Sequence, residues 1–255
     1  MPLSPFERIR LDKAAVDEGF GLKRPDDGDW LVYAGLGTPA IVRMTCREGK
    51  YIVAVNHAGV AVDLAQRWPQ WNKALPDEYL AGFAAFTVDD TEPLHQLLGE
   101  VRRLARALPN EPLRIFEWET KSLPRSTEAE RLVIQRVGQN IFREALLTYW
   151  GGRCAVTGVG DSRLLRASHI KPWADCATDA ERLDAYNGLL LAANVDAAFD
   201  AGLISFSDDG SIRYSPEFLE ADQDALGLNR AMKLRRISPG HLPNLLWHRE
   251  RVLRK

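Results

Sequence analysis

The chain has 255 residues, of which 45% are apolar and 27% charged, values typical of one large or two ordinary globular domains. No apolar run reaches the roughly 18–20 residues of a membrane span, and the N-terminus lacks the apolar core of a signal peptide. The three cysteines, Cys46, Cys154 and Cys176, form no C-x-x-C pair, which argues against a disulfide framework or a four-cysteine zinc site. We therefore expect a cytoplasmic protein without a membrane partner.

Charge is distributed unevenly along the chain. The formal total is −2, but residues 121–255 carry +2 and residues 1–120 carry −4. Residues 230–255 hold eight basic residues and one acidic residue. Phosphates respond to charge within a Debye length of about 8–10 Å, so local charge matters more than the total. The basic tail is therefore compatible with a nucleic-acid partner despite the acidic total.

Residues 1–108 are expected to form a compact α+β domain. The pattern predicts a short helix over residues 6–20 and two strands within residues 39–56, on either side of a glycine-containing turn. Apolar residues at helical spacing predict a second helix over residues 91–107.

The aromatic residues of this domain allow two interpretations. They could form its core, or they could line a pocket for a flipped base, and the core is the commoner arrangement. The residues concerned are Trp30, Tyr33, Trp68 and Trp71. His57 and His95 have no partner pattern and are interpreted as structural.

Residues 109–126 carry three prolines and no clear period, which predicts a linker between domains. A long helix should follow, because Thr127 and Glu130 have the spacing of a capping box, and Gly151 and Gly152 should end it. Its apolar stripe comprises Leu132, Val133, Val137, Ile141, Ala145 and Tyr149.

Residues 127–255 begin with this helix and continue with strands. The pattern predicts a strand that ends at His169, a long polar loop, and a buried strand within residues 189–194. A short helix should follow, with Asn194 as its N-cap and Gly202 after its end. A hairpin and a basic C-terminal helix, packed through Leu245, Leu246 and Trp247, should complete the chain.

Three stretches carry a family resemblance: "CAVTG", "ASHIKPW" and "NGLLLAANVDAAFDAGLISF". Together, over roughly residues 127–255, they resemble the HNH endonuclease family, which has the ββα-metal nuclease fold, and most closely its bacterial restriction-type subgroup. The joint spacing of several motifs is more specific than any one of them. The resemblance implies an α+β chain in which a nuclease domain follows the N-terminal domain.

The resemblance also implies roles for individual residues. His169 matches the general base, and Asn187 matches the asparagine that ties the loop and orients the base. Asp196 matches the third signature position, a metal ligand, and Asp200 lies one helical turn further on, where some members place a second ligand. Ser168 stands where the family often has Asp or His, which removes a ligand.

These residue types suit phosphodiester hydrolysis. An imidazole can take a proton from water near neutral pH. Carboxylates at i and i+4 share one helix face and could bind one cation, and oxygen ligands favour Mg²⁺ or Mn²⁺ over Zn²⁺. Each residue also has an ordinary alternative: His169 as a hydrogen-bonded histidine, Asn187 as a turn residue, and Asp196 as an acid near a helix N-terminus.

Basic residues near these motifs are candidates for binding the backbone of double-stranded DNA. The set comprises Arg163, Arg166, Lys171, Arg235, Arg236, Arg249 and Arg251. The alternative for the first three is a solvated strand edge. The tail is expected both to pack against the domain and to contact DNA.

The sequence therefore predicts a divalent-metal-dependent DNA endonuclease, with a restriction or phage-defence role and with target recognition by the N-terminal domain. A homodimer fits this hypothesis, because cleavage of both strands generally needs two active sites. Two alternatives stay open at this point. One is a DNA-binding or regulatory protein with a degenerate HNH fold, for which Ser168 is the best argument. The other is a ligand-activated anti-phage nuclease effector.

Overall fold

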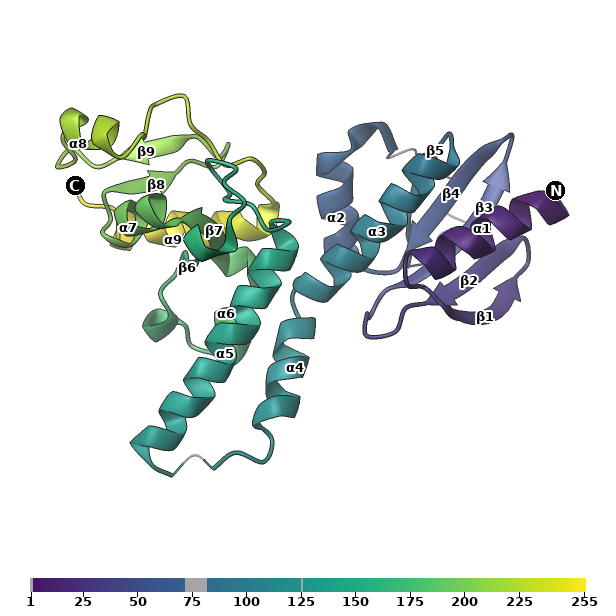
Figure 1. Cartoon of the computed structure of the whole chain (residues 1–255), viewed down its shortest axis with the longest axis horizontal. Coiled ribbons are helices and arrows are strands. Elements are labelled where there is room, and N and C mark those ends of the chain that lie inside the picture. The colour runs from purple at the N-terminus through teal and green to yellow at the C-terminus, as the bar shows by residue number, and fades with distance from the viewer. Residues whose placement is uncertain (1, 72–81, 125) are drawn as a thin grey trace. The chain divides into compact units, whose positions relative to one another are not determined.

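The structure is a computed structural model that describes residues 2–71, 82–124 and 126–255. The chain divides into two compact units, Met1–Arg106 and Ala107–Lys255. Both units combine helices and strands (Figure 1), which confirms the predicted α+β class. No helix in the described ranges has both the length and the apolar character that crossing a bilayer requires.

The first unit is built on a five-stranded antiparallel sheet whose strands are ordered as in the chain. The strands are β1 (Leu22–Asp27), β2 (Trp30–Ala34), β3 (Ile41–Arg47), β4 (Lys50–Val55) and β5 (Ala84–Val88). β3 and β4 are the two strands predicted within residues 39–56. Glu48 and Gly49, both at positive φ, form the turn between them.

The helices in the described part of this unit are α1 (Pro5–Asp17), α2 (Ala58–Arg67) and α3 (Thr91–Ala107), and a short 3-10 turn, η1 (Pro69–Trp71), follows α2. α1 packs on β3, and α2 packs on β4 and β5. The helix predicted over residues 91–107 is confirmed, and its apolar face is fully buried.

The aromatic residues of the first unit belong mainly to its core. Trp30, Tyr33 and Trp71 are each at most 8% exposed. Trp68 stacks on Trp71, with ring centroids 4.6 Å apart. The interpretation as core residues is therefore confirmed for the three buried side chains.

The second unit starts with a helical hairpin of α4 (Glu111–Thr120) and α5 (Glu128–Tyr149) (Figure 1). The prediction of a linker over residues 109–126 is therefore wrong where α4 forms and packs on α5. The prolines did not prevent the helix, because Pro112 lies in its first turn, where a missing N–H costs nothing. Phe116, 3% exposed, supplies the tertiary packing.

The start of α5 is as predicted, because Thr127 and Glu130 form both hydrogen bonds of the capping box. The apolar stripe is buried only in its C-terminal part, at Ile141, Ala145 and Tyr149. Leu132 and Val133 are 52% and 50% exposed, so the prediction is wrong for these two residues. They precede the part of α5 that contacts strands.

β6 (Leu165–His169) and β7 (Gly188–Ala192) form an antiparallel ribbon, and α7 (Ala193–Asp200) packs on both strands. The predicted strand end at His169 and the buried second strand are confirmed. The predicted N-cap is wrong: Ala192 is the N-cap of α7, and Asn194 lies in its first turn. The Asn194 amide donates to the Leu226 carbonyl, so a tertiary contact holds it instead.

The loop between the ribbon strands contains three short turns of helix: η4 (Trp173–Asp175), α6 (Asp179–Arg182) and η5 (Ala185–Asn187). Another, η3 (Ser162–Leu164), precedes β6. After α7 come the predicted hairpin, β8 (Ile204–Phe206) and β9 (Ile212–Tyr214), then α8 (Glu220–Ala225), η6 (Pro239–His241) and α9 (Leu242–Arg251).

α9 packs on β8 through a face that shares Leu245 with the predicted one. Leu245 and His248 are buried, as expected for Leu245, but Leu246 is 49% exposed. The prediction that Leu246 packs against the domain is therefore wrong. His241, just before α9, and His248 share the buried face with Leu245, because residues at i, i+4 and i+7 line one side of a helix.

His241 and His248 are buried as neutral rings. Burial lowers the pKa of His241 to about 3 and that of His248 to about 4. His248 stacks on Phe199 at 3.9 Å between ring centroids, and its Nδ1 lies 3.0 Å from the Ser205 hydroxyl. In the unfolded chain both rings regain ordinary pKa values near 6.5.

This difference predicts acid sensitivity of folding. The unfolded state binds more protons than the folded state below pH 6.5, so stability falls as the pH falls toward the folded pKa values. Each histidine should cost about 1.4 kcal/mol of unfolding free energy per pH unit within that window. We expect His248→Gln to flatten the decline measured by denaturant unfolding between pH 6.5 and 4.5. An unchanged slope would show that His248 does not titrate on unfolding.

Candidate active site

His169 ends β6 with its ring held in one tautomer. Its Nε2 lies 2.8 Å from the Arg182 carbonyl oxygen. A carbonyl only accepts, so Nε2 carries the proton and Nδ1 keeps its lone pair. Burial lowers the pKa of His169, and the bond to Arg182 opposes this in part. The ring is therefore neutral near pH 7, in the state that can accept a proton.

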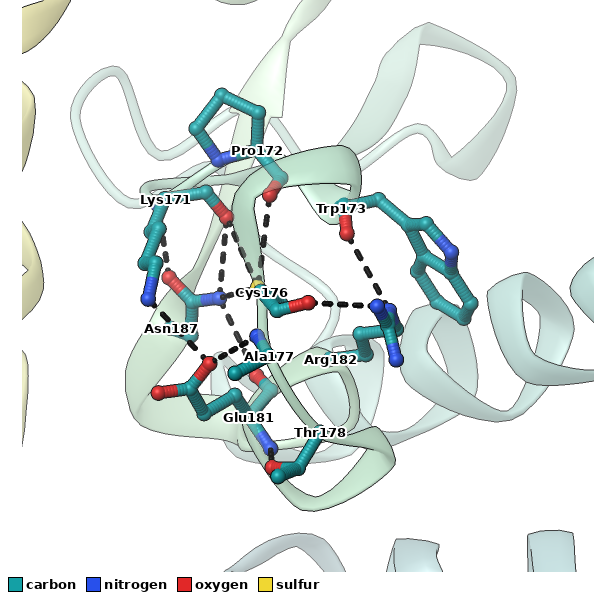
Figure 2. A network of polar contacts seen from close by, with 9 residues as sticks. All are labelled: Lys171, Pro172, Trp173, Cys176, Ala177, Thr178, Glu181, Arg182 and Asn187. Atoms are coloured by element: carbon teal, nitrogen blue, oxygen red, sulfur yellow. Dashed lines mark hydrogen bonds and ion pairs between the residues drawn. The ribbon is translucent and has the colours of Figure 1, made fainter.

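Asn187 ties both ends of the loop after His169 together (Figure 2). Its Oδ1 accepts from the Lys171 backbone N–H at 2.8 Å, and its Nδ2 donates to the Lys171 carbonyl at 3.1 Å. The same Nδ2 lies 3.2 Å from the Glu181 carbonyl and 3.3 Å from the Cys176 sulfur. Asn187 is 1% exposed, so its polar atoms are satisfied by the loop. The bond to the Glu181 carbonyl thereby fixes the backbone one residue before the carbonyl of Arg182.

Arg182 also stabilises this loop through hydrogen bonds to its backbone. Its guanidinium donates to the carbonyls of Cys176 at 2.5 Å and Trp173 at 3.3 Å (Figure 2). It also pairs with Asp179 at 3.0 Å. Its own carbonyl receives the His169 bond. Sequence reasoning missed Arg182, because a backbone carbonyl leaves no signature in residue types.

Asp196 and Asp200 lie one turn apart on α7, and Ser168 links them to β6. The Ser168 hydroxyl donates to Asp200 Oδ1 at 3.1 Å. Burial, and then the charge of Asp200, raise the pKa of Asp196, whereas Ser168 and Arg166 lower it. Burial also raises the pKa of Asp200. The structure thus brings together the two acidic residues predicted from the sequence, beside the residue that precedes His169.

The chemistry of this pair fits a hard divalent cation. Asp196 and Asp200 are close enough for their negative charges to repel each other, which a bound cation would relieve. Their carboxylate oxygens are ligands of the kind that Mg²⁺ prefers. No lysine or arginine in the described ranges forms an ion pair with either one. The same ranges contain no group of three or more His, Cys, Asp or Glu side chains arranged to hold a metal. Water and a bound phosphate would have to complete the coordination.

Several predicted DNA-binding residues have partners within the protein. Arg163 pairs with Asp161 at 2.6 Å, Lys171 with Glu181 at 3.3 Å, and Arg249 with Asp208 at 2.7 Å. Arg236 stacks over the rings of Tyr149 and Trp150, at 3.9 and 4.7 Å. Each of these side chains therefore has a structural contact.

The side chains of the remaining three candidates are exposed to solvent. Arg166 is exposed, although its guanidinium donates to the carbonyls of Arg163 and Leu165. It is close enough to Asp196 to lower the pKa of that carboxyl. Arg235 and Arg251 are exposed, and within the described ranges their side chains form no ion pair.

Comparison with known families points to the same segment. Residues 154–207 match the sequence model of the HNH endonuclease family. The match contains the ribbon and α7, with all four of His169, Asn187, Asp196 and Asp200. No curated protein matches the chain. The HNH family consists generally of nucleases, so the similarity of this segment of the second unit suggests nuclease activity on nucleic acid.

Proposed function

We propose that the protein is a divalent-metal-dependent DNA endonuclease with His169 as its general base. The observation that carries this proposal is the bond from His169 Nε2 to the Arg182 carbonyl. It leaves Nδ1 as the basic atom, on a ring whose pKa is lowered. The ring lies in the segment that matches a nuclease family.

In the proposed reaction, Nδ1 takes a proton from a water molecule. The oxygen of that water bonds to phosphorus, and the bond from phosphorus to the leaving oxygen breaks. Solvent returns a proton to the leaving oxygen. Asn187 and Arg182 act as positioning residues, because their contacts hold the loop that carries the acceptor for Nε2–H.

Asp196 and Asp200 would hold the divalent cation. When bound there, Mg²⁺ or Mn²⁺ supplies charge neutralisation at the scissile phosphate and at the leaving oxygen. Ser168 positions the pair through its bond to Asp200. Because Asp196 and Asp200 lie on one short helix and supply only one side of the coordination sphere, we expect weak metal binding without DNA and tighter binding when the scissile phosphate adds a ligand.

Arg166 is the arginine that we expect to contact the phosphate backbone beside this pair. In a His169→Ala background, which binds without cleaving, Arg166→Ala should weaken DNA binding for all sequences. The slope of log affinity against log salt should decrease by about 0.9 in magnitude, the value for one lost phosphate contact. Arg249→Ala is the matched control, because Arg249 already pairs with Asp208. An equal effect of both changes would contradict a local role of Arg166.

We further propose a restriction or phage-defence role, in which the first unit selects the target. Its support is a compact unit with its own sheet and core, separate from the HNH segment. Cleavage of differently modified phage DNAs by the full chain tests this role. Selective digestion supports it, whereas equal digestion of all of them contradicts it.

The decisive experiment for the nuclease is cleavage of supercoiled plasmid by the purified full chain with Mg²⁺ or Mn²⁺. We expect nicked and linear DNA, and no cleavage after chelation of the metal. A folded protein that binds DNA but leaves the plasmid intact with both metals would instead support the binding protein with a degenerate HNH fold.

A further inference from the structure

Two aromatic side chains hold the ring of His169, in addition to its hydrogen bond. The imidazole stacks on Phe142 of α5, with ring centroids 3.7 Å apart and planes 13° apart. The indole of Trp173 meets the imidazole edge to face, at 5.6 Å and 88°. A single hydrogen bond leaves a ring free to turn about the bond axis. Contacts with its face and its edge oppose that rotation.

Phe142 can take this position because residue 188 has no side chain. A Cβ atom on Gly188 would lie 2.5 Å from Phe142 Cζ and 2.7 Å from Leu146 Cδ1. Gly188 has φ −145°, which any residue adopts, so the requirement for glycine here is one of space. The glycine after Asn187 therefore lets β7 approach α5 closely enough to seat the stacking ring.

Trp173 is seated in the same way, against Gly138, which lies one helical turn before Phe142. A Cβ atom on Gly138 would lie 2.6 Å from Trp173 Cη2. Glycine inside a helix is unfavourable, so a close approach of this kind supplies a reason for it. Arg182 also contacts Trp173, with its Nε 3.3 Å from the Trp173 carbonyl and its guanidinium 5.7 Å from the ring.

We propose that Phe142 and Trp173 are positioning residues that keep His169 Nδ1 pointing in one direction. We call these two rings, with the glycines that admit them, Gly138 and Gly188, the aromatic clamp. This inference rests on the proposed function of His169 as the base. The clamp acts through the ring of His169 and needs no contact with DNA.

Phe142→Leu is the main test, in the full chain with plasmid DNA and Mg²⁺ or Mn²⁺. Leucine keeps an apolar side chain but removes the stacking face. We expect kcat to fall about 10- to 100-fold, with KM changed less than about twofold, because orientation of the base matters in the transition state rather than in binding. Phe206→Leu, at a fully buried phenylalanine of β8, is the control for lost packing and should keep the wild-type kcat.

Gly138→Ala tests the second half of the clamp and serves if Phe142→Leu does not fold. Alanine favours the helix, so a purely structural role predicts a more stable protein with unchanged kcat. We expect instead a reduced kcat, because the added methyl group displaces Trp173. Gln139→Ala, the exposed neighbour in α5, is the control. Unchanged kcat in Gly138→Ala would overturn the role of Trp173.

Nitrogen-15 NMR of labelled histidines separates the clamp from the nuclease proposal. The His169 signal, assigned by its loss in His169→Ala, should have the pattern of an Nε2–H tautomer. In Phe142→Leu its nitrogen chemical shifts should move toward the averaged values of an unrestrained imidazole that exchanges between its two tautomers. Wild-type tautomer and wild-type kcat in Phe142→Leu together overturn the clamp. A wild-type chain that never cleaves DNA overturns the nuclease and the catalytic part of the clamp, while the NMR shift still decides whether Phe142 orients the ring.

Discussion

His169→Ala should reduce DNA cleavage by about 10²- to 10⁴-fold, the usual cost of losing a general base. Binding of DNA should change little, because the ring is largely buried between Phe142 and Trp173. The measurement is plasmid cleavage under single-turnover conditions, beside DNA affinity and thermal unfolding of the same variant. Wild-type cleavage by a folded variant would contradict the assignment of His169.

His169→Gln provides a matched variant. Its side-chain amide can still donate to the Arg182 carbonyl, so the loop keeps its partner while the proton acceptor is lost. We expect the same loss of activity as for alanine, with less loss of stability. Recovery of cleavage by glutamine would show that His169 acts by holding the loop rather than as a base.

The pH dependence of the wild type follows from the same residue. The neutral ring is the active form, and burial lowers its pKa below 6.5. The rate should therefore fall on the acid side through a pKa below that of an ordinary histidine, and should be on a plateau at pH 7. An acid limb centred above pH 6.5 would contradict a buried base.

Asp196→Asn and Asp200→Asn should each impair cleavage, with the larger loss at Asp196, the signature position. Both carboxyls have raised pKa values, so their charged forms destabilise the folded protein at neutral pH. Each variant should therefore unfold at a higher temperature than the wild type in the absence of metal. This opposite movement of activity and stability distinguishes a functional carboxylate pair from a structural one.

Metal addition provides the complementary measurement. Millimolar Mn²⁺ should raise the unfolding temperature of the wild type, because a ligand that binds the folded state stabilises it. The two asparagine variants should show a smaller rise, and Ser168→Asp, which adds a third carboxylate beside Asp200, a larger one. Equal shifts in all four proteins would place the metal elsewhere, and normal cleavage by both asparagine variants would remove the pair from the mechanism.

Sequence patterns alone determined the elements that depend on local interactions. The capping box of Thr127 and Glu130 marks the start of α5, and the two runs on either side of a glycine-containing turn within residues 39–56 predicted β3 and β4. The i, i+4 spacing of Asp196 and Asp200 determines that they share a helix face, whatever the helix packs against. These features are encoded within a few residues, so they could be predicted.

The tertiary structure decided which groups surround His169 and what the linker becomes. α4 forms because Phe116 packs near Gly138, more than twenty residues away in the chain. The spacing of apolar residues within 109–126 does not predict that contact. The acceptor for Nε2–H is a backbone carbonyl, which every residue possesses, so no residue type could reveal it. In the sequence, nothing distinguishes Phe142 from the other apolar residues of the predicted helix. Only the close approach of β7, allowed by Gly188, turns its ring toward the histidine.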